Sequence, residues 1–274
     1  MNKKLLLVLL FLFILFFSWP KQSGDLTLYF LDVGQGDAIF ISTPYGQNIL
    51  IDGGPDNLLL YRLGQVLPWT ERTIDYLIIS HYHADHLVGL IELVNKYQVK
   101  NIIVTAHQPE EDFLYRIWQE KLREKELTTT IVKAGEVFVL GADLSWQILL
   151  ADSQHEDFNE NSIVLKLTYG QVDFLFTGDL GEEGEKKLLS LGFDLQAEVL
   201  KVGHHGSKYS STPEFLEAVS PELCVIQAGL NNKFKHPHPE AIDRFQKINC
   251  QLLGNIELGN IKIFSDGQGY YLKN

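Results

Sequence analysis

The sequence has few cysteines, and this excludes a small protein held together by many disulfides. Among 274 residues there are two cysteines, Cys224 and Cys250, too few for a disulfide framework. Each lies in an apolar stretch typical of a strand, so we expect buried free thiols, with a disulfide between them as the alternative. Neither has a second Cys or His at ligand spacing, so a zinc site built on cysteine is not expected.

Basic runs are also scarce. The chain has 23 Lys and Arg against 35 Asp and Glu, a formal net charge of −12. One short cluster, Lys121-Leu-Arg-Glu-Lys125, is interleaved with glutamate and is typical of a solvated helix face. Proteins that grip long nucleic acids usually present basic stretches. The composition therefore gives no support to extended DNA binding, although a bound metal would add local positive charge for a phosphate.

The longest apolar run, Leu5–Phe17, has 13 residues, fewer than the ~20 that a spanning helix normally needs. It follows Lys3 and Lys4, and Trp19 comes just after it. This pattern predicts that residues 1–20 are a secretory signal peptide, or a membrane anchor with Trp19 at the interface. Either way, we expect an exported protein, secreted or anchored to the outer face of the cytoplasmic membrane. The membrane would be a partner only if the segment is kept.

The remainder, residues 25–274, shows no linker or repeat and is predicted to be one domain. Apolar runs that alternate or end at glycine predict strands, and apolar residues returning every three or four positions predict helices. The pattern indicates an α/β domain with mixed sheets. The expected strands are 26–31, 38–42, 47–52, 76–80, 102–105, 136–140, 144–150, 162–169, 172–177 and 224–228, and the expected helices are 58–66, 86–96, 113–125, 182–191 and 213–219.

The most informative stretch is the run Ser80-His-Tyr-His-Ala-Asp-His-Leu87. It follows an apolar segment that reads as a buried strand, so the ligand-type side chains come from the strand's carboxyl end. Neutral imidazole and carboxylate are ligands of Zn²⁺ and similar cations. His81 and His83 can reach one ion while Asp85 and His86 reach a neighbouring one. We predict a metal site here; a histidine-rich polar loop is the alternative.

The spacing His-x-His-x-Asp-His resembles that of the metallo-β-lactamase-fold hydrolases. Other motifs occur in the order seen in the hydrolase domain of ComEC/Rec2-type competence proteins, and they are also similar to those of bacterial phosphorylcholine esterases. The resemblance runs from about Leu26 to about Tyr271 and implies a four-layer αββα sandwich. Its motifs are Asp32-Val-Gly-Gln-Gly-Asp37, Ile51-Asp-Gly-Gly54, Thr177-Gly-Asp179, Leu200-Lys-Val-Gly-His-His-Gly-Ser207 and His236-Pro-His-Pro239.

The same resemblance implies roles for individual residues. Asp179, after a predicted strand, would bridge two cations, and His204, first after a strand and glycine, would be a further ligand. His205 would then face the substrate or transfer a proton, although the order of these two histidines could be reversed. We assign catalytic roles to His205 and Asp85. Asp32, Asp37 and Asp52 are expected to orient ligating imidazoles, with turn capping as the alternative, above all for Asp32.

One expected ligand is absent. Many hydrolases of this superfamily have a histidine just before the strand that leads to the bridging aspartate, where this chain has Asn159 and Asn161. Asparagine is a poor zinc ligand but hydrogen-bonds phosphate or water well. His155 is the one imidazole available as a substitute, with a surface loop as the alternative. One or two Zn²⁺ ions are therefore expected, the second weaker, with Mn²⁺ as an alternative. Further predicted substrate contacts are Lys201, His236 and His238.

These features predict metal-assisted hydrolysis, and the resemblance to ComEC-type domains and phosphorylcholine esterases implies a phosphodiester substrate, with DNA as one candidate. The ion would lower the pKa of a bound water from near 16 towards ~7, and His205 or His238 would protonate the leaving group. Two alternatives remain: an esterase acting on a small or cell-wall-linked substrate, and a metal-binding scaffold without turnover. The sequence does not indicate any protein partner.

Overall fold

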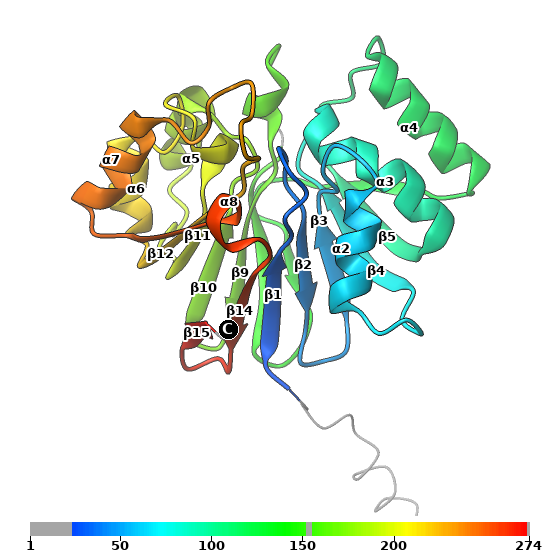
Figure 1. The fold of residues 1–274 in the computed structure, drawn as a ribbon, viewed down its shortest axis with the longest axis horizontal. Coiled ribbons are helices and arrows are strands. Elements are labelled where there is room, and N and C mark those ends of the chain that lie inside the picture. Colours follow the sequence, from blue (N-terminus) through cyan, green and yellow to red (C-terminus); the bar gives the residue numbers. More distant parts are fainter. Residues whose placement is uncertain (1–23, 152–154, 273–274) are drawn as a thin grey trace, which may run out of the picture.

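The computed structural model describes residues 24–151 and 155–272, which form two mixed sheets packed face to face (Figure 1). The first sheet has eight strands in the order β15-β14-β1-β2-β3-β4-β5-β6. Its strands are β1 (Leu26–Phe30), β2 (Ile39–Ser42), β3 (Asn48–Ile51), β4 (Thr73–Ile79), β5 (Gln98–Val104), β6 (Thr129–Ile131), β14 (Ile261–Ser265) and β15 (Tyr270–Leu272).

The second sheet has seven strands in the order β13-β12-β11-β10-β9-β8-β7. In both sheets one half is parallel, with β3 to β6 in the first and β10 to β13 in the second, and the rest is antiparallel. The strands are β7 (Val137–Val139), β8 (Leu144–Leu150), β9 (Val164–Tyr169), β10 (Val172–Phe176), β11 (Val199–Lys201), β12 (Leu223–Ile226) and β13 (Gln251–Gly254).

Helices cover the outer face of each sheet. Buried side chains of α2 (Leu58–Val66), α3 (Ala84–Lys96) and α4 (Phe113–Glu124) join the outer face of the first sheet in one apolar cluster. Those of α5 (Glu182–Ser190), α6 (Pro213–Val219) and α7 (Pro239–Lys247) do the same on the second sheet, and the short α8 (Asn255–Leu258) follows β13. The two helical layers lie on opposite sides of the sandwich (Figure 1). The predicted four-layer αββα architecture is confirmed.

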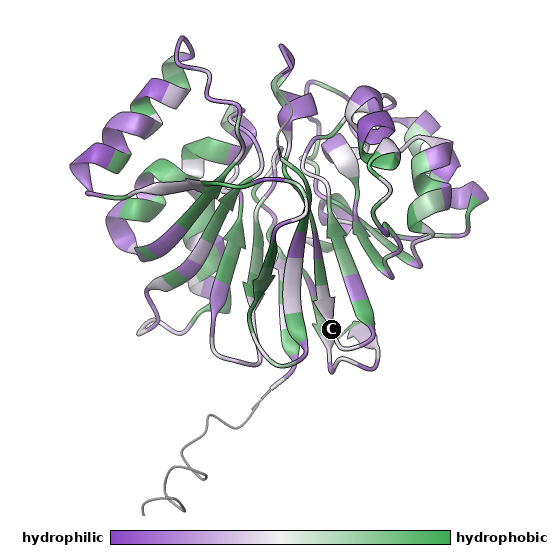
Figure 2. Ribbon diagram, turned by 180° about the vertical axis from the view of Figure 1, so that it is seen from behind, coloured by the Kyte–Doolittle hydropathy of each residue, from purple (hydrophilic) through white to green (hydrophobic). Residues whose placement is uncertain are grey.

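The strand sequences explain the double sheet. In β1, Leu26, Leu28 and Phe30 are fully buried while the residues between them are half-buried, because alternate side chains of a strand point to opposite faces. Those three enter the cluster between the sheets, where Trp146 of β8 and Phe174 of β10 also lie. In Figure 2 the strands are largely hydrophobic and the helices carry hydrophilic outer stripes, so each sheet buries one face in the other sheet and one under helices.

The parallel halves place the loops that carry the predicted ligands. The histidine run follows β4, Asp179 follows β10, and His204 and His205 follow β11. Ligands of α/β proteins gather at the carboxyl ends of such strands. The two packed sheets therefore bring three loops, far apart in sequence, to one edge of the sandwich.

The C-terminal elements differ from prediction, because α7, α8, β14 and β15 were not expected, and β13 was indicated only by the apolar stretch around Cys250. Helix α7 begins at Pro239, the last residue of the motif His236-Pro-His-Pro239. Proline favours the first helical position because its fixed φ fits a helix and its missing N–H would have no partner there. The strands β13 and β15 are three or four residues long, too short for a clear alternating pattern.

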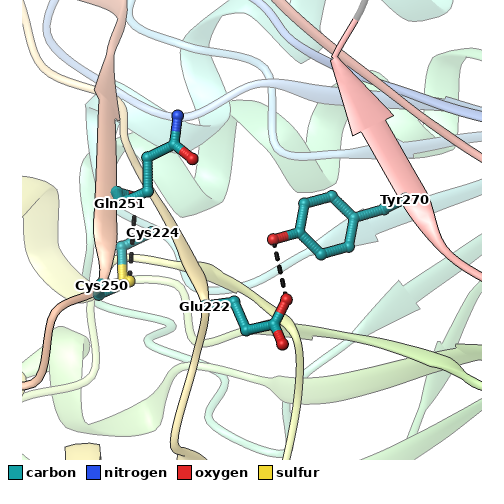
Figure 3. The surroundings of a disulfide bond; sticks show 5 residues. All are labelled: Glu222, Cys224, Cys250, Gln251 and Tyr270. Carbon is teal, nitrogen blue, oxygen red and sulfur yellow. Dashed lines mark hydrogen bonds between the residues drawn. A yellow bond between two sulfur atoms is a disulfide. The ribbon is translucent and has the colours of Figure 1, made fainter.

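The prediction of two free thiols is wrong: Cys224 and Cys250 form a disulfide, with 6.0 Å between their Cα atoms (Figure 3). Cys224 lies on β12, and Cys250 immediately precedes β13. These strands pair in parallel, so Cys224 lies opposite Leu252. Parallel pairing brings together residues 26 positions apart, which spacing along the chain does not reveal.

The predicted signal or anchor, residues 1–20, lies outside the described residues. Within residues 24–151 and 155–272, no helix combines the length and the apolar character needed to cross a membrane.

Candidate metal centre

Four side chains meet at the edge of the sandwich: Asp85 and His86 from the first turn of α3, Asp179 from the segment after β10, and His205 from the segment after β11. One ligand-type atom from each lies within 4.8 Å of the other three. The Nε2 atoms of His86 and His205 are each 3.2 Å from Asp179 Oδ2, and His205 Nε2 is 3.3 Å from Asp85 Oδ2. All are buried except Asp85, whose side chain is 25% exposed. We call these four residues the ligand group.

The unpaired atoms of the ligand group fit a divalent cation. His86 Nε2, His205 Nε2 and Asp179 Oδ1 are buried and have no hydrogen-bond partner among the described residues. The other ring nitrogen of each histidine is engaged: His86 Nδ1 donates to Asp52 at 2.9 Å, and His205 Nδ1 donates to the carbonyl of Gln227 at 2.8 Å. With Nδ1 held as the donor, an ion that displaces the Nε2 proton would meet a lone pair directed into the group, as in a metal-binding histidine oriented from behind.

The charge of the ligand group also calls for a cation. Burial disfavours a charge on either histidine, but the carboxylate of Asp179 outweighs it and raises the pKa of both His86 and His205 well above the ordinary value. Burial likewise opposes the charge on Asp179, yet His205 and His86 hold its pKa well below the usual range. The buried carboxylates are thus stabilised by positive charge, which either protonated histidines or a bound metal ion can supply.

His81 and His83 lie beside the ligand group but outside it. The ring centroids of His81 and His86 are 4.2 Å apart, and His81 Nε2 is 3.1 Å from His83 Nδ1. Burial, with the neighbouring His86, lowers the pKa of His81 well below its ordinary value, so the ring is neutral. His81 and His83 form an incomplete second ligand set, and the prediction that they serve a different ion from Asp85 and His86 stays a prediction.

Two of the three aspartates expected to orient imidazoles do lie behind the centre. Asp52 accepts hydrogen bonds from His86 and from Ser80 N and Oγ, the last two at 2.8 and 2.6 Å. Asp37 Oδ1 is 3.3 Å from His205 Nδ1, and its other oxygen pairs with Lys201. The prediction for Asp32 is wrong. Its carboxylate pairs with Arg62 at 2.6 Å and accepts from Gly34 N in its own turn.

Lys201 is not positioned to contact substrate, contrary to prediction. Its side chain is 1% exposed, pairs with Asp37 and donates to the carbonyl of Gly178 at 3.1 Å. Lys201 lies on β11, which is flanked by β10 and β12. A strand in the middle of a sheet with both faces covered leaves no route for its side chain to solvent.

The structure brings His205, rather than His204, into the ligand group. His204 Nε2 is 4.0 Å from Asp179 Oδ2, and its side chain is 26% exposed. Both residues have a left-handed backbone, with φ of 48° and 56°. This conformation is uncommon outside glycine, and such residues gather at functional sites. The geometry thus favours the reversed order, with His205 as the ligand candidate and His204 facing outward.

The asparagines have different surroundings. Asn161 is buried and its amide is fully used, because Oδ1 accepts from His155 N at 2.7 Å and Nδ2 donates to the carbonyl of His155 at 2.8 Å. It fixes its loop and cannot reach substrate, contrary to prediction. Asn159 Oδ1 is buried without a hydrogen-bond partner in the described part of the chain. His155 pairs with Glu183 at 3.0 Å on the surface and does not replace the missing histidine.

A cavity of about 140 Å³ adjoins the ligand group. His236, a predicted substrate contact, lines it, and burial, with the neighbouring His205, lowers the pKa of His236 to about 4. His238 does not line the cavity; its Nδ1 accepts from Lys208 N at 3.2 Å. Gln35 and Phe234 were not predicted, although the glycines on both sides of Gln35 signal a tight turn. The full lining is Gln35, His83, Asp85, Asn159, Asp179, His204, His205, Phe234 and His236.

The fold and the ligand group define a metal-binding α/β sandwich, and the chain belongs to the metallo-beta-lactamase superfamily, whose family model matches residues 31–229. Among curated proteins it is similar to ComE operon protein 3 of Bacillus subtilis (strain 168), with 29% identity over 90% of this chain and 34% of that protein. It is similar also to competence protein ComA of Neisseria gonorrhoeae, with 30% identity over 91% of this chain and 33% of that protein. The chain spans about a third of the length of these relatives. The predicted resemblance to competence proteins is confirmed.

Solved structures support the fold. CmlA, a diiron beta-hydroxylase from Streptomyces venezuelae, is 15% identical and superposes with a TM-score of 0.59, covering 88% of this chain and 54% of that one. A diphosphatase from the PhnP family is 14% identical with a TM-score of 0.52, covering 88% of this chain and 98% of that one. At such low identity the likeness concerns the sandwich alone.

Proposed function

We propose that this protein is a metal-dependent hydrolase that cleaves phosphodiester bonds. The observation that carries the proposal is the ligand group, whose buried Nε2 and carboxylate atoms are unpaired and converge beside a cavity. Asp85, His86, Asp179 and His205 would hold the ion, with Zn²⁺ preferred for its affinity for imidazole and Mn²⁺ as the alternative. A bound ion supplies a water of lowered pKa and neutralises charge on the attacked oxygen.

The chain's own residues supply orientation and proton transfer. Asp52 and the carbonyl of Gln227 hold the two ligand histidines by Nδ1. Nδ1 of His205 is held by Gln227, and its Nε2 would bind the ion, so His205 has no nitrogen left to protonate the leaving group. We assign that step to Nε2 of His204, which lines the cavity and is partly exposed. Asp85, at the cavity wall, is placed to accept a proton from the attacking water as well as to serve as a ligand.

A DNA substrate is the finer proposal. Three exposed lysines, Lys208, Lys233 and Lys235, stand on the two loops that bring His204, His205, Phe234 and His236 to the cavity. Phe234 is 47% exposed, and its ring stacks on that of His236. Lysines beside an exposed aromatic ring are typical of sites for single-stranded nucleic acid. The name of one relative, competence protein ComA, also motivates this choice.

The disulfide supports the proposed export of the domain. Disulfides persist in oxidising compartments and are rare in the bacterial cytosol, and Cys224 and Cys250 form one. Together with the apolar run of residues 5–17, this leads us to propose that residues 1–20 direct the domain across the cytoplasmic membrane. Cell fractionation with a periplasmic or extracellular marker tests it, and a purely cytosolic protein with reduced cysteines would contradict it.

Hydrolysis of bis-p-nitrophenyl phosphate and of single-stranded DNA by the full chain tests the function. The assay is run metal-free and with Zn²⁺ or Mn²⁺, beside Asp179→Ala and the exposed control Asp243→Ala. We expect metal-dependent cleavage of both substrates, lost in Asp179→Ala and kept in Asp243→Ala. If the protein cleaves the small diester but shows no salt-sensitive DNA binding, the proposed DNA substrate is wrong and a small substrate takes its place. If it binds metal but cleaves neither substrate, the proposed hydrolase function is contradicted.

A further inference from the structure

Gln35 lies in a turn that packs directly against a residue of the ligand group. The turn links β1 to β2, and Asp37 N in it donates to the carbonyl of Asp85 at 3.2 Å. A Cβ on the neighbouring Gly36, whose φ is 144°, would lie 2.2 Å from that carbonyl oxygen. Only glycine fits there, so the backbone on one side of Gln35 is fixed against Asp85.

A second loop fixes the side chain of Gln35. Its Oε1 accepts a hydrogen bond from Gly229 N at 3.1 Å. A Cβ on Gly229 would lie 2.6 Å from Gln35 N, so this contact too requires glycine. The bond to Gly229 settles the orientation of the amide, because a backbone N–H needs an oxygen as its acceptor. The other end of the amide is therefore the NH₂ group.

That NH₂ group has no partner in the described part of the chain. Gln35 Nε2 is buried and makes no hydrogen bond within the described residues, although the side chain lines the cavity beside the ligand group. An amide nitrogen has no lone pair available for a cation, so its partner must be an electron-rich atom. A buried donor without an acceptor is unfavourable, and such groups in native structures call for a functional explanation.

We propose that Gln35 donates from Nε2 to a non-bridging phosphoryl oxygen of the bound diester. This assignment rests on the proposed phosphodiesterase function and adds a catalytic residue to it. A fixed neutral donor beside this oxygen stabilises the negative charge that grows on it as water attacks the phosphorus, and the charge then passes to the leaving-group oxygen as its bond to phosphorus breaks. The loop contact through Gly229 holds the donor in place before substrate arrives.

Gln35→Glu separates the donor from the anchor. A glutamate keeps an oxygen for Gly229 N, so a purely structural role is preserved, while the NH₂ group is replaced by a carboxylate oxygen that repels phosphate. For bis-p-nitrophenyl phosphate we expect kcat/KM to fall on the order of 100-fold, and competitive inhibition by inorganic phosphate to weaken. Metal content by atomic emission and the melting temperature should match those of the wild type. Gln268→Glu, which adds the same charge on an exposed turn, should leave all four quantities unchanged.

The outcomes distinguish the two proposals. A metal-loaded wild type that cleaves no diester overturns the phosphodiesterase and this role of Gln35 with it. An active wild type with Gln35→Glu within about twofold of it overturns the role of Gln35 alone, and so does a loss explained by a lower metal content. If Gln35→Glu lowers the melting temperature, Gln35→Met is compared with the wild type, because it adds no charge, although it removes the oxygen for Gly229 N as well as the donor. A kcat/KM within about twofold of the wild type then overturns the role of Gln35, and a fall on the order of 100-fold at unchanged metal content supports it.

Discussion

At the scale of single residues, the centre depends on charges held inside the protein. Lys201 and Asp37 are an ion pair with side chains 1% and 2% exposed, and Asp37 in turn contacts His205. Burial opposes the charge on Asp37, but Lys201 and His205 outweigh it and lower its pKa. The carboxylate therefore stays ionised and can hold the ring of His205, so a lysine that never meets substrate supports a ligand.

Removing Lys201 should leave a buried charge without compensation. We expect Lys201→Met to lower the free energy of unfolding by about 3–5 kcal/mol, measured by urea denaturation. The double variant Lys201→Met with Asp37→Asn should recover most of that loss, because no charge is then left unpaired. Lys100→Met, which breaks the half-exposed pair with Asp75, should cost far less, because solvent screens an exposed pair. Equal losses in the two single variants would contradict this account.

The adjacent histidines should differ in metal binding. We expect His205→Ala to lose the more tightly bound ion, because His205 belongs to the ligand group, whereas His204→Ala should keep it. Activity should fall in both, since His204 lines the cavity. Metal content after dialysis against a weak chelator is the measurement. Retention of the ion in His205→Ala with its loss in His204→Ala would restore the order predicted from sequence.

At the scale of elements, the loop after the two histidines is held from two helices. Glu185 of α5 accepts from Ser211 N and from Thr212 N, the second at 2.8 Å, and so fixes the start of α6. Arg244 of α7 donates to the carbonyls of Lys208 and Ser210 at 3.1 and 2.8 Å. The segment that follows the left-handed residues His204 and His205 is therefore held in place by hydrogen bonds to the side chains of Glu185 and Arg244.

This brace predicts a pH dependence of stability. Burial raises the pKa of Glu185 from 4.5 to about 7, although the backbone N–H of Thr212 opposes the shift. Between these values the folded protein holds a proton that the unfolded chain has released, so stability falls as pH rises from about 4.5 to 7. From pH 5 to 8 the wild type should lose about 1–3 kcal/mol more than Glu185→Gln. Exposed Glu182→Gln should follow the wild type, and parallel curves for all three proteins would contradict the prediction.

Elements with a strong local pattern were predictable, and those defined by neighbours were not. Helix 58–66 was predicted at its observed bounds, and helix 113–125 ends one residue earlier in the structure, because an apolar stripe every three or four residues suffices to identify it. Strands β13 and β15 have three or four residues and mixed exposure, and they exist because β12 and β14 supply hydrogen-bond partners. The same limit of sequence-based prediction applies to Asn161, because the conformation of its loop, rather than its being an asparagine, decides which groups its amide contacts.

At the scale of the whole molecule, the disulfide closes the outer end of the second sheet. It joins β12 to the turn before β13 across α7, with 26 positions between the cysteines. Reduction should lower the free energy of unfolding by about 2–4 kcal/mol, because the unfolded chain gains freedom once the loop is open. Denaturation with and without a phosphine reductant measures the change. A Cys224→Ala, Cys250→Ala variant should not respond to the reductant, and a wild type that does not respond either would contradict the prediction.

The sequence by itself determined the class of fold and the chemical type of the site. Its apolar runs, bounded by glycines, predict the strands, because strand formation depends on local hydrophobicity. The histidines and aspartates that follow β4, β10 and β11 are of the residue types that bind metal ions, and this depends on side-chain chemistry alone. Only the tertiary structure decided which imidazole enters the ligand group, that Lys201 is buried and Asp32 remote, that the cysteines pair, and that Gln35 lines the cavity. Each of these depends on a distance between segments far apart in the chain, which the packing of two sheets sets and no local pattern contains.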